Sequence, residues 1–200
     1  MTSLRTRAAA KPAPRAAFVV PTLAAARVTL RPIVHADAPA IFGLFSDREV
    51  TRYWSRPPMT HLAQARRLVR DIRAGYRSGE TIQFGIERQR DLDLVGTCTL
   101  FHIHSQSRRA ELGYALGRAY WGHGLMHEAL QRLLAYAFDD LGLHRLEADI
   151  DPRNEASRRT LARLGFVKEG FLRERWIVAD VISDTELYGL LGREWARPDA

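Results

Sequence analysis

Two glycines, Gly122 and Gly124, stand between residues 111–116, which have strand character, and a segment with helical periodicity. The apolar side chains of that segment recur at the spacing of one helix face: Leu125, Ala129, Leu130, Leu133, Leu134 and Phe138. The first N–H groups of such a helix have no partner inside it and lie at the positive end of its dipole, so they suit a phosphate. Glycine lets the backbone approach the anion closely. The turn therefore predicts a phosphate site, although an ordinary helix start fits the same spacing.

The length and composition indicate one folded domain. Two hundred residues with 46% hydrophobic side chains are enough for one packed core. Cys98 is the only cysteine, which excludes an internal disulfide and a thiolate metal cluster and favours a cytoplasmic setting. No apolar run is long enough to span a bilayer, so no membrane partner is expected.

The net charge of +7 is compatible with a polyanion or with an acidic small cofactor. Part of this charge lies in an Arg/Ala/Pro-rich N-terminal stretch, and no basic patch with interleaved aromatic residues is evident. Nucleic-acid binding is therefore not expected. We expect residues 1–24 to form a disordered basic tail ahead of a folded domain over residues 25–195.

Periodicity and turn residues divide the rest of the chain into seven strands and four helices. Strands are expected over residues 27–33, 81–88, 94–104, 111–116, 145–150, 166–176 and 184–191, and helices over 38–45, 61–77, 125–140 and 155–164. Thr60 is the expected cap of the second helix. The strands joined through helix 125–140 should be parallel, and hairpins make the others antiparallel. The predicted fold class is α+β, a single domain whose mixed, mostly antiparallel sheet of about seven strands carries helices on both faces.

Five short motifs occur together in a fixed order. They are Ala110-Glu111-Leu112-Gly113-Tyr114, Trp121-Gly122-His123-Gly124, Glu128-Ala129, Asn154-Glu155-Ala156-Ser157 and Gly165-Phe166. This combination resembles the GNAT superfamily of N-acetyltransferases, and more narrowly its ribosomal-protein-alanine acetyltransferase (RimJ/RimL-like) branch. The resemblance covers roughly residues 25–193. It is specific for the superfamily and much less specific for the substrate.

The resemblance implies that acetyl-coenzyme A is the donor and a primary amine the acceptor, which attacks directly in a ternary complex. The acceptor could be a protein N-terminal α-amine or a small-molecule amine, and a homodimer stays open. The alternative is a non-catalytic acyl-coenzyme A-binding or regulatory module. Ala119 and Trp176 favour that alternative, because they stand where the family has polar groups.

The resemblance also names the residues that would contact the donor. The turn would hold the pyrophosphate, Asn154 matches an asparagine that contacts the pantetheine arm, and Ser157 matches a serine near the thiolate. The complete expected set is Tyr114, Leu116, Trp121, Gly122, His123, Gly124, Leu125, Met126, Asn154 and Ser157. A backbone N–H near residues 114–116 would stabilise the oxyanion if a bulge opens the strand there. Ser157 could instead be a first-turn serine bonded to the 151–154 turn.

Amide formation requires a base, because an alkyl amine is mostly protonated at neutral pH. Glu111 matches a glutamate that serves as base in several family members, so it is expected to act as the base directly or through a water molecule. The alternative is a structural carboxylate paired with Arg108 or Arg109. Glu174 is a reserve base, since strand alternation would place it on the same side as Trp176. The choice between the two glutamates stays open.

The remaining polar and aromatic candidates carry weaker signals. Tyr53 and Trp54 lie in the loop between the first two helices, where they either line the acceptor site or pack in the core. His102 and His104 alternate onto one strand face and suit solvent or the acceptor groove better than a metal. No metal site is expected, because the His-Glu-x-x-His order is absent.

Overall fold

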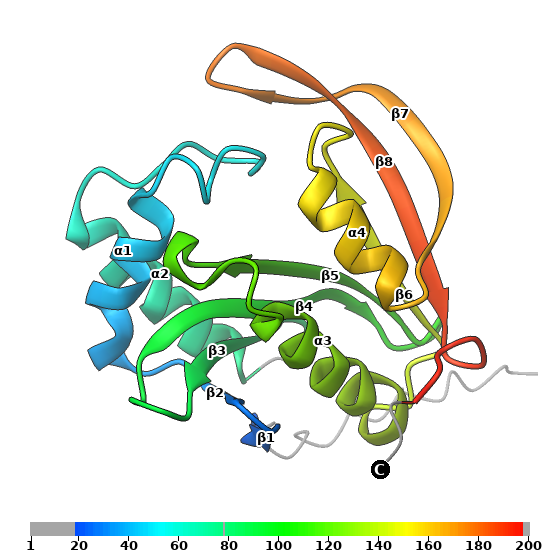
Figure 1. Ribbon diagram of the computed structural model, residues 1–200, viewed down its shortest axis with the longest axis horizontal. Coiled ribbons are helices and arrows are strands. Elements are labelled where there is room, and N and C mark those ends of the chain that lie inside the picture. The colour runs from blue at the N-terminus through cyan, green and yellow to red at the C-terminus, as the bar shows by residue number, and fades with distance from the viewer. Residues whose placement is uncertain (1–18, 78, 198–200) are drawn as a thin grey trace, which may run out of the picture.

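A computed structural model describes residues 19–77 and 79–197, which form an eight-stranded sheet in the order β1-β2-β3-β4-β5-β6-β8-β7 (Figure 1). The strands are β1 (Leu23–Ala24), β2 (Val28–Pro32), β3 (Ile82–Arg88), β4 (Leu94–His104), β5 (Arg109–Leu116), β6 (Arg145–Ile150), β7 (Val167–Val178) and β8 (Val181–Leu191). The helices are α1 (Ala38–Ser46), α2 (Leu62–Gly75), α3 (Leu125–Ala135) and α4 (Glu155–Arg163), with short 3-10 turns at His35–Asp37 and Arg118–Tyr120 and a π-helical turn at Tyr136–Asp140. The α+β class, the mixed sheet and its mostly antiparallel pairing are confirmed.

The eighth strand is β1, which lies in the stretch expected to be tail. Residues 1–18 of that stretch lie outside the described residues. Leu23 and Ala24 pair with Leu30 and Thr29 of β2, and the side chains of Val20 and Leu23 are buried. The folded part therefore begins before residue 25, because these two apolar side chains join the main core.

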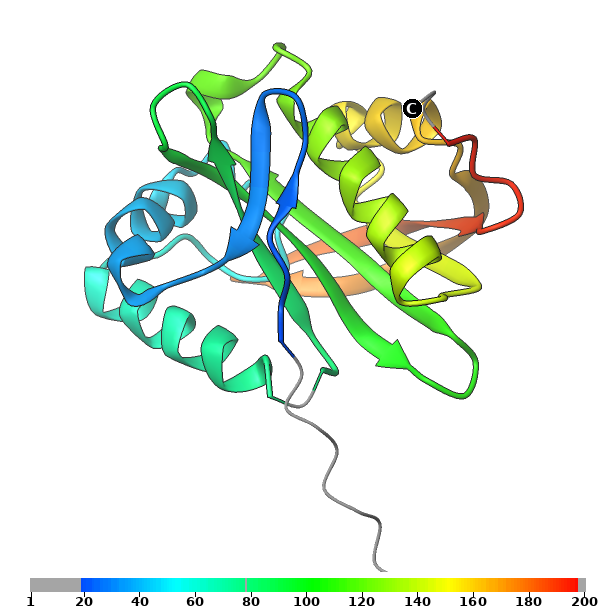
Figure 2. The same ribbon diagram turned by 90° about the horizontal axis from the view of Figure 1, so that it is seen from below.

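Helices cover both faces of the sheet, and each face has its own apolar core (Figure 2). Strand alternation sends Ala110 and Leu112 of β5 into the core beneath α3 and α4, where Leu130 and Leu161 are fully buried. The opposite core lies beneath α1 and α2 and includes Ala115 of β5. Odd-numbered residues of β5 therefore face the α1–α2 side of the sheet.

The ends of two helices differ from the sequence expectation. His61, and not Thr60, is the N-cap of α2, and the Gln64 side chain accepts the N–H groups of both residues. The expected helix 125–140 keeps its length, but its last five residues are π-helical. There the N–H of Leu141 reaches back five residues to the carbonyl of Tyr136.

Within residues 19–77 and 79–197, the pairing of β5 with β6 is the one parallel ladder, as expected from the intervening helix, and it is short. It joins residues 109–111 to residues 145–147, yet β5 continues to Leu116 and β6 to Ile150. Beyond Glu111, β5 is paired only with β4, and beyond Glu147, β6 is paired only with β8. The sheet thus opens between β5 and β6, while β4 and β8 remain paired to their outer edges.

In the part of the chain that the structure describes, no helix is both long and apolar enough to cross a membrane.

Replacing Leu161 by alanine tests how firmly α4 is held to the sheet. The leucine is fully buried, so the substitution should lower the free energy of unfolding by about 2–5 kcal/mol through lost burial and a cavity. Urea denaturation measures the change. Arg159→Ala, on the exposed side of the same helix, is the control and should change stability by less than about 0.5 kcal/mol. Equal effects of the two substitutions would contradict the packing described here.

Candidate functional site

The turn ahead of α3 leaves its first amide groups without a side-chain cap. Gly122 and Gly124 have φ angles of 77° and 75°, in the left-handed region where a Cβ atom is costly. Gly124 is the N-cap of α3. Because glycine has no side chain, no N-cap side chain accepts a hydrogen bond from the first N–H groups of the helix. A Cβ at Gly122 would meet no atom within 4 Å. The predicted phosphate turn is thus built with its helix-start donors open to an anion.

Arg27 supports this turn from the loop before β2. Its Nη1 donates to the carbonyl oxygen of His123 at 2.9 Å, and its Nε donates to Oε2 of Glu128 at 2.7 Å. Because the C=O and N–H of one peptide point in opposite directions, this bond directs the N–H of Gly124 away from Arg27. Burial opposes the charge of Glu128, but the hydrogen bonds from Arg27 outweigh it and lower the pKa of that carboxyl.

The other residues of the expected turn contribute through the backbone. Leu116 and Leu125 are buried in the α3–α4 core, and Met126 packs against it. Trp121 is 45% exposed, while its indole N–H donates to the carbonyl of Leu116 at 2.7 Å. Leu116 and Leu125 therefore leave only backbone groups to face a ligand at the turn, whereas part of the Trp121 ring stays exposed beside it.

Tyr114, Asn154 and Ser157 come together across the opening between β5 and β6. The hydroxyl groups of Tyr114 and Ser157 lie 2.6 Å apart, and the Asn154 side chain caps α4 by accepting the N–H of Ser157 at 3.1 Å. Burial raises the pKa of Tyr114 to about 12, so its hydroxyl stays protonated at neutral pH. Three expected donor-site residues therefore form one cluster, which joins the central strand to α4.

The strand β5 has no bulge near Tyr114, contrary to the sequence expectation. Its pairing with β4 runs without a register shift from Glu111 to Leu116. The strand is instead opened at its other edge, where the ladder with β6 ends. Apart from the Leu116 carbonyl, which accepts from Trp121, the backbone groups of residues 112–116 on that edge are the ones left for an extended ligand.

On the α1–α2 side of the same opening, Glu111 lies near a second carboxylate, Asp149. Oε1 of Glu111 lies 2.9 Å from Nδ1 of His102, whereas Arg109 pairs with Glu147, so neither arginine neighbour neutralises Glu111 as one alternative assumed. Asp149 accepts the Trp176 indole N–H at 3.2 Å. Burial raises the pKa of Asp149, and the charge of Glu111 raises it further.

Asp149 is a candidate site residue that sequence reasoning missed. Glu111 is in register with Glu147, and Asp149 follows two residues later on the same face. That register was the only available signal, and it requires knowing the pairing of β5 with β6. Two carboxylates therefore face the point where the ladder opens.

The reserve base Glu174 does not follow the alternation from which it was inferred. The β7–β8 register shifts between Leu172 and Trp176, and Glu174 lies inside this irregularity with a φ of 51°. Its backbone N–H donates to the Asp184 side chain at 2.8 Å. Alternation across a bulge no longer places Glu174 on the face of Trp176.

The structure separates the two aromatic residues of the loop after α1. Trp54 packs against Phe45 in the α1–α2 core, with ring centroids 4.7 Å apart. Tyr53 lies under the guanidinium of Arg153, 6.0 Å from it, and so next to the turn between β6 and α4. Only Tyr53 is placed beside the elements that carry the site.

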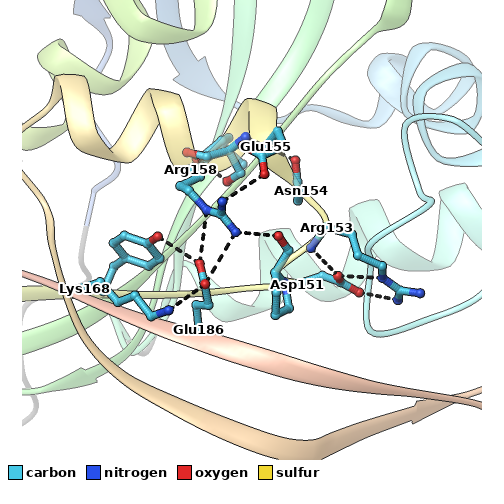
Figure 3. A network of polar contacts seen from close by, with 11 residues as sticks. Asp151, Arg153, Asn154, Glu155, Arg158, Lys168 and Glu186 are labelled. Carbon is cyan, nitrogen blue, oxygen red and sulfur yellow. Dashed lines mark hydrogen bonds and ion pairs between the residues drawn. The ribbon is translucent and has the colours of Figure 1, made fainter.

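A polar network fastens the start of α4 to the final hairpin (Figure 3). The buried Glu186 of β8 accepts from Lys168 at 2.7 Å and from Tyr188 at 2.9 Å, and Arg158 of α4 pairs with it at 3.3 Å. Arg158 also donates to the carbonyl of Pro152 at 2.6 Å. The network fixes the turn that carries Asn154.

The described residues contain no group of three or more metal-ligating side chains placed to hold an ion. Cys98 is fully buried, and burial raises the pKa of its thiol, so it is not poised as a nucleophile.

Comparison with known proteins agrees with this geometry. An acetyltransferase (GNAT) domain family matches residues 27–167. The uncharacterized N-acetyltransferase p20 of Bacillus licheniformis is 38% identical over 175 residues, which cover 88% of this chain and 98% of that protein. The structure of Mycobacterium smegmatis RimJ in complex with CoA-disulfide superposes with a TM-score of 0.79 at 28% identity, covering 89% and 90% of the two chains. The ribosomal protein uS5-alanine N-acetyltransferase of Escherichia coli is 31% identical over 121 residues, 60% of this chain and 62% of that protein.

Glu186→Gln tests the polar network through its pH dependence. Burial disfavours the charge of Glu186, but bonds from Lys168 and Tyr188 and the charge of Arg158 outweigh it, so the pKa of Glu186 is lowered. A carboxyl group with a lowered folded pKa contributes stability above its unfolded pKa and loses it as the pH falls through the folded one. The substitution should cost about 1–3 kcal/mol at pH 7.

That cost should shrink as the pH falls below the ordinary glutamate range, where Glu186 itself becomes protonated. Urea denaturation over a pH series measures it. The control is Glu155→Gln, which removes an exposed ion pair to Arg158 and should cost less than about 0.5 kcal/mol. A cost for Glu186→Gln that does not change with pH would show that charge is not its cause.

Proposed function

This chain belongs to the acetyltransferase (GNAT) family, and on that premise we propose that it transfers the acetyl group of acetyl-coenzyme A to a primary amine. The acceptor is a protein N-terminal α-amine or a small-molecule amine. The observation that carries the proposal is the uncapped turn at Gly122 and Gly124, next to the opening between β5 and β6. Relatives that modify a ribosomal-protein alanine support the amine class.

The donor would be held by groups on the α3–α4 side of the sheet. Backbone N–H groups of residues 122–126 suit its diphosphate, and the freed edge of β5 suits the amide-bearing pantetheine arm. Asn154 and Ser157 stand at the start of α4, beside that edge. The bound donor supplies an activated acyl group.

The acceptor would approach from the α1–α2 side, where Glu111 and Asp149 attract an ammonium group. In this proposal Glu111 accepts the proton that the amine must lose, and Asp149 orients the amine. On the donor side, the hydroxyl groups of Ser157 and Tyr114 stabilise the departing thiolate, because a protonated hydroxyl can donate to it. The amine attacks the thioester directly while both molecules are bound.

Gly122→Asp tests the phosphate turn, because a Cβ atom there would meet no other atom within 4 Å. An added carboxylate should weaken coenzyme A binding about tenfold or more, because like charges about 4 Å apart repel by roughly 1–4 kcal/mol. Gly122→Asn is the matched control, since asparagine has nearly the same shape and tolerates the left-handed backbone, but carries no charge. Calorimetry at low salt measures both affinities. If both variants bind as the wild type does, the diphosphate does not bind at this turn.

Glu111→Gln tests the base. It should lower kcat about 10²- to 10⁴-fold, the usual contribution of a positioned base, while coenzyme A affinity stays unchanged. Release of thiol from acetyl-coenzyme A with a panel of amines measures the rate. Glu87→Gln, on strand β3, which β4 separates from β5, is the control and should retain the wild-type rate. Full activity of Glu111→Gln would exclude Glu111 as the base, and no thiol release with any amine would contradict the proposed function.

A further inference from the structure

A bulge in β4 turns His102 toward Glu111. Phe101 is in register with Glu111, but the next pair joins His104 to Arg109, so β4 has one extra residue there. Phe101 and Glu111 therefore share a face of the sheet, and regular alternation would send His102 to the opposite face. His104 is in register with Arg109, which lies on the same face as Glu111, so His102 and His104 do share a face, but the bulge and not regular alternation places them there. A bulge is a common means of re-aiming a side chain next to an active site.

The backbone of His102 is strained in the conformation that turns its side chain toward Glu111. Its φ is 49°, in the left-handed region that residues with a Cβ atom rarely adopt. Such strain persists only where the surrounding structure imposes it, and it concentrates at functional positions. Glycine would occupy this position without strain, so a histidine here costs stability.

The histidine connects Glu111 to solvent. Nδ1 of His102 lies 2.9 Å from Oε1 of Glu111, while 71% of the histidine side chain is exposed. Glu111 itself is only 31% exposed. In the described structure the other acidic groups near Glu111 are Glu147, which is paired with Arg109 and Arg145, and Asp149, which is bonded to Trp176, so neither offers a comparable route to water.

Acetyl transfer creates a need for such a route. Each turnover converts an ammonium ion and a thioester into an amide, a thiol and one proton, and this proton must leave the site. We infer that His102 passes the proton from Glu111 to solvent, an inference that rests on the proposed function with Glu111 as the base. Imidazole is the side chain that readily accepts and releases protons in the neutral range.

The proton transfers balance over one cycle. The C–N bond forms and the C–S bond breaks, while the nitrogen loses two protons, one to the Glu111 carboxylate and one to the departing sulfur, which leaves as the thiol. In the tautomer with its hydrogen on Nε2, His102 accepts that proton at Nδ1 and releases the Nε2 proton to water. The tautomers then re-equilibrate through solvent. The cycle ends with Glu111 ionised and His102 neutral.

Two substitutions of His102 separate the relay from a structural role. Asparagine tolerates the left-handed backbone and can still hydrogen-bond Glu111, but it cannot carry a proton. His102→Asn should therefore lower kcat about tenfold, below the full effect of losing a base. His102→Gly removes the strain, so it should be at least as stable as the wild type and yet slow, and added imidazole should restore its rate.

Arg108→Gly is the matched control. Arg108 has a φ of 48° in the same β4–β5 hairpin, so glycine relieves the same kind of strain there without touching Glu111. It should leave kcat unchanged, with or without imidazole. Wild-type kcat in His102→Asn, or a His102→Gly rate that imidazole does not raise, would overturn the relay and leave the proposed function intact. Absence of transfer by the wild-type protein would overturn both.

Discussion

The early end of the parallel ladder between β5 and β6 is the constraint on which the site depends. After residues 111 and 147 the two strands no longer bond each other, but β4 and β8 hold them from outside. Each strand can therefore leave its neighbour without losing its own pairing. The Tyr114–Ser157 bond and the Glu186 network then hold α4 across the opening, so that the gap in the ladder does not close or widen freely.

Strand alternation places different functional groups of the candidate site on the two faces of the sheet. On β5, Tyr114 lies toward α3 and α4, while Glu111 lies toward α1 and α2. Hydroxyl groups and open amides therefore gather on one side, and carboxylates on the other. An anionic donor would bind on the side with the amides and hydroxyl groups, and a cationic acceptor on the side with the carboxylates. The two could come into contact only where the ladder is interrupted.

Local patterns predicted the elements well, and long-range geometry accounts for what they missed. The turn at Gly124, the order of strands and helices and the family resemblance all come from signals that are contiguous in the sequence, and the family is confirmed. Strand β1 was missed because two residues carry no periodicity. The bulge at His102 looks like regular alternation, and Asp149 gains significance only from its register against Glu111. Trp54 could not be told from a surface aromatic before its packing on Phe45 was known.

The hold of Arg27 on Glu128 and His123 joins segments about a hundred residues apart. Fraying of the short β1–β2 hairpin would release the carbonyl of His123 and let the adjacent peptide rotate. Because linkage is reciprocal, a donor bound at that peptide would also disfavour the open state of the hairpin. Amide exchange in the first strands of the chain would then depend on occupancy at the start of a helix that begins a hundred residues later.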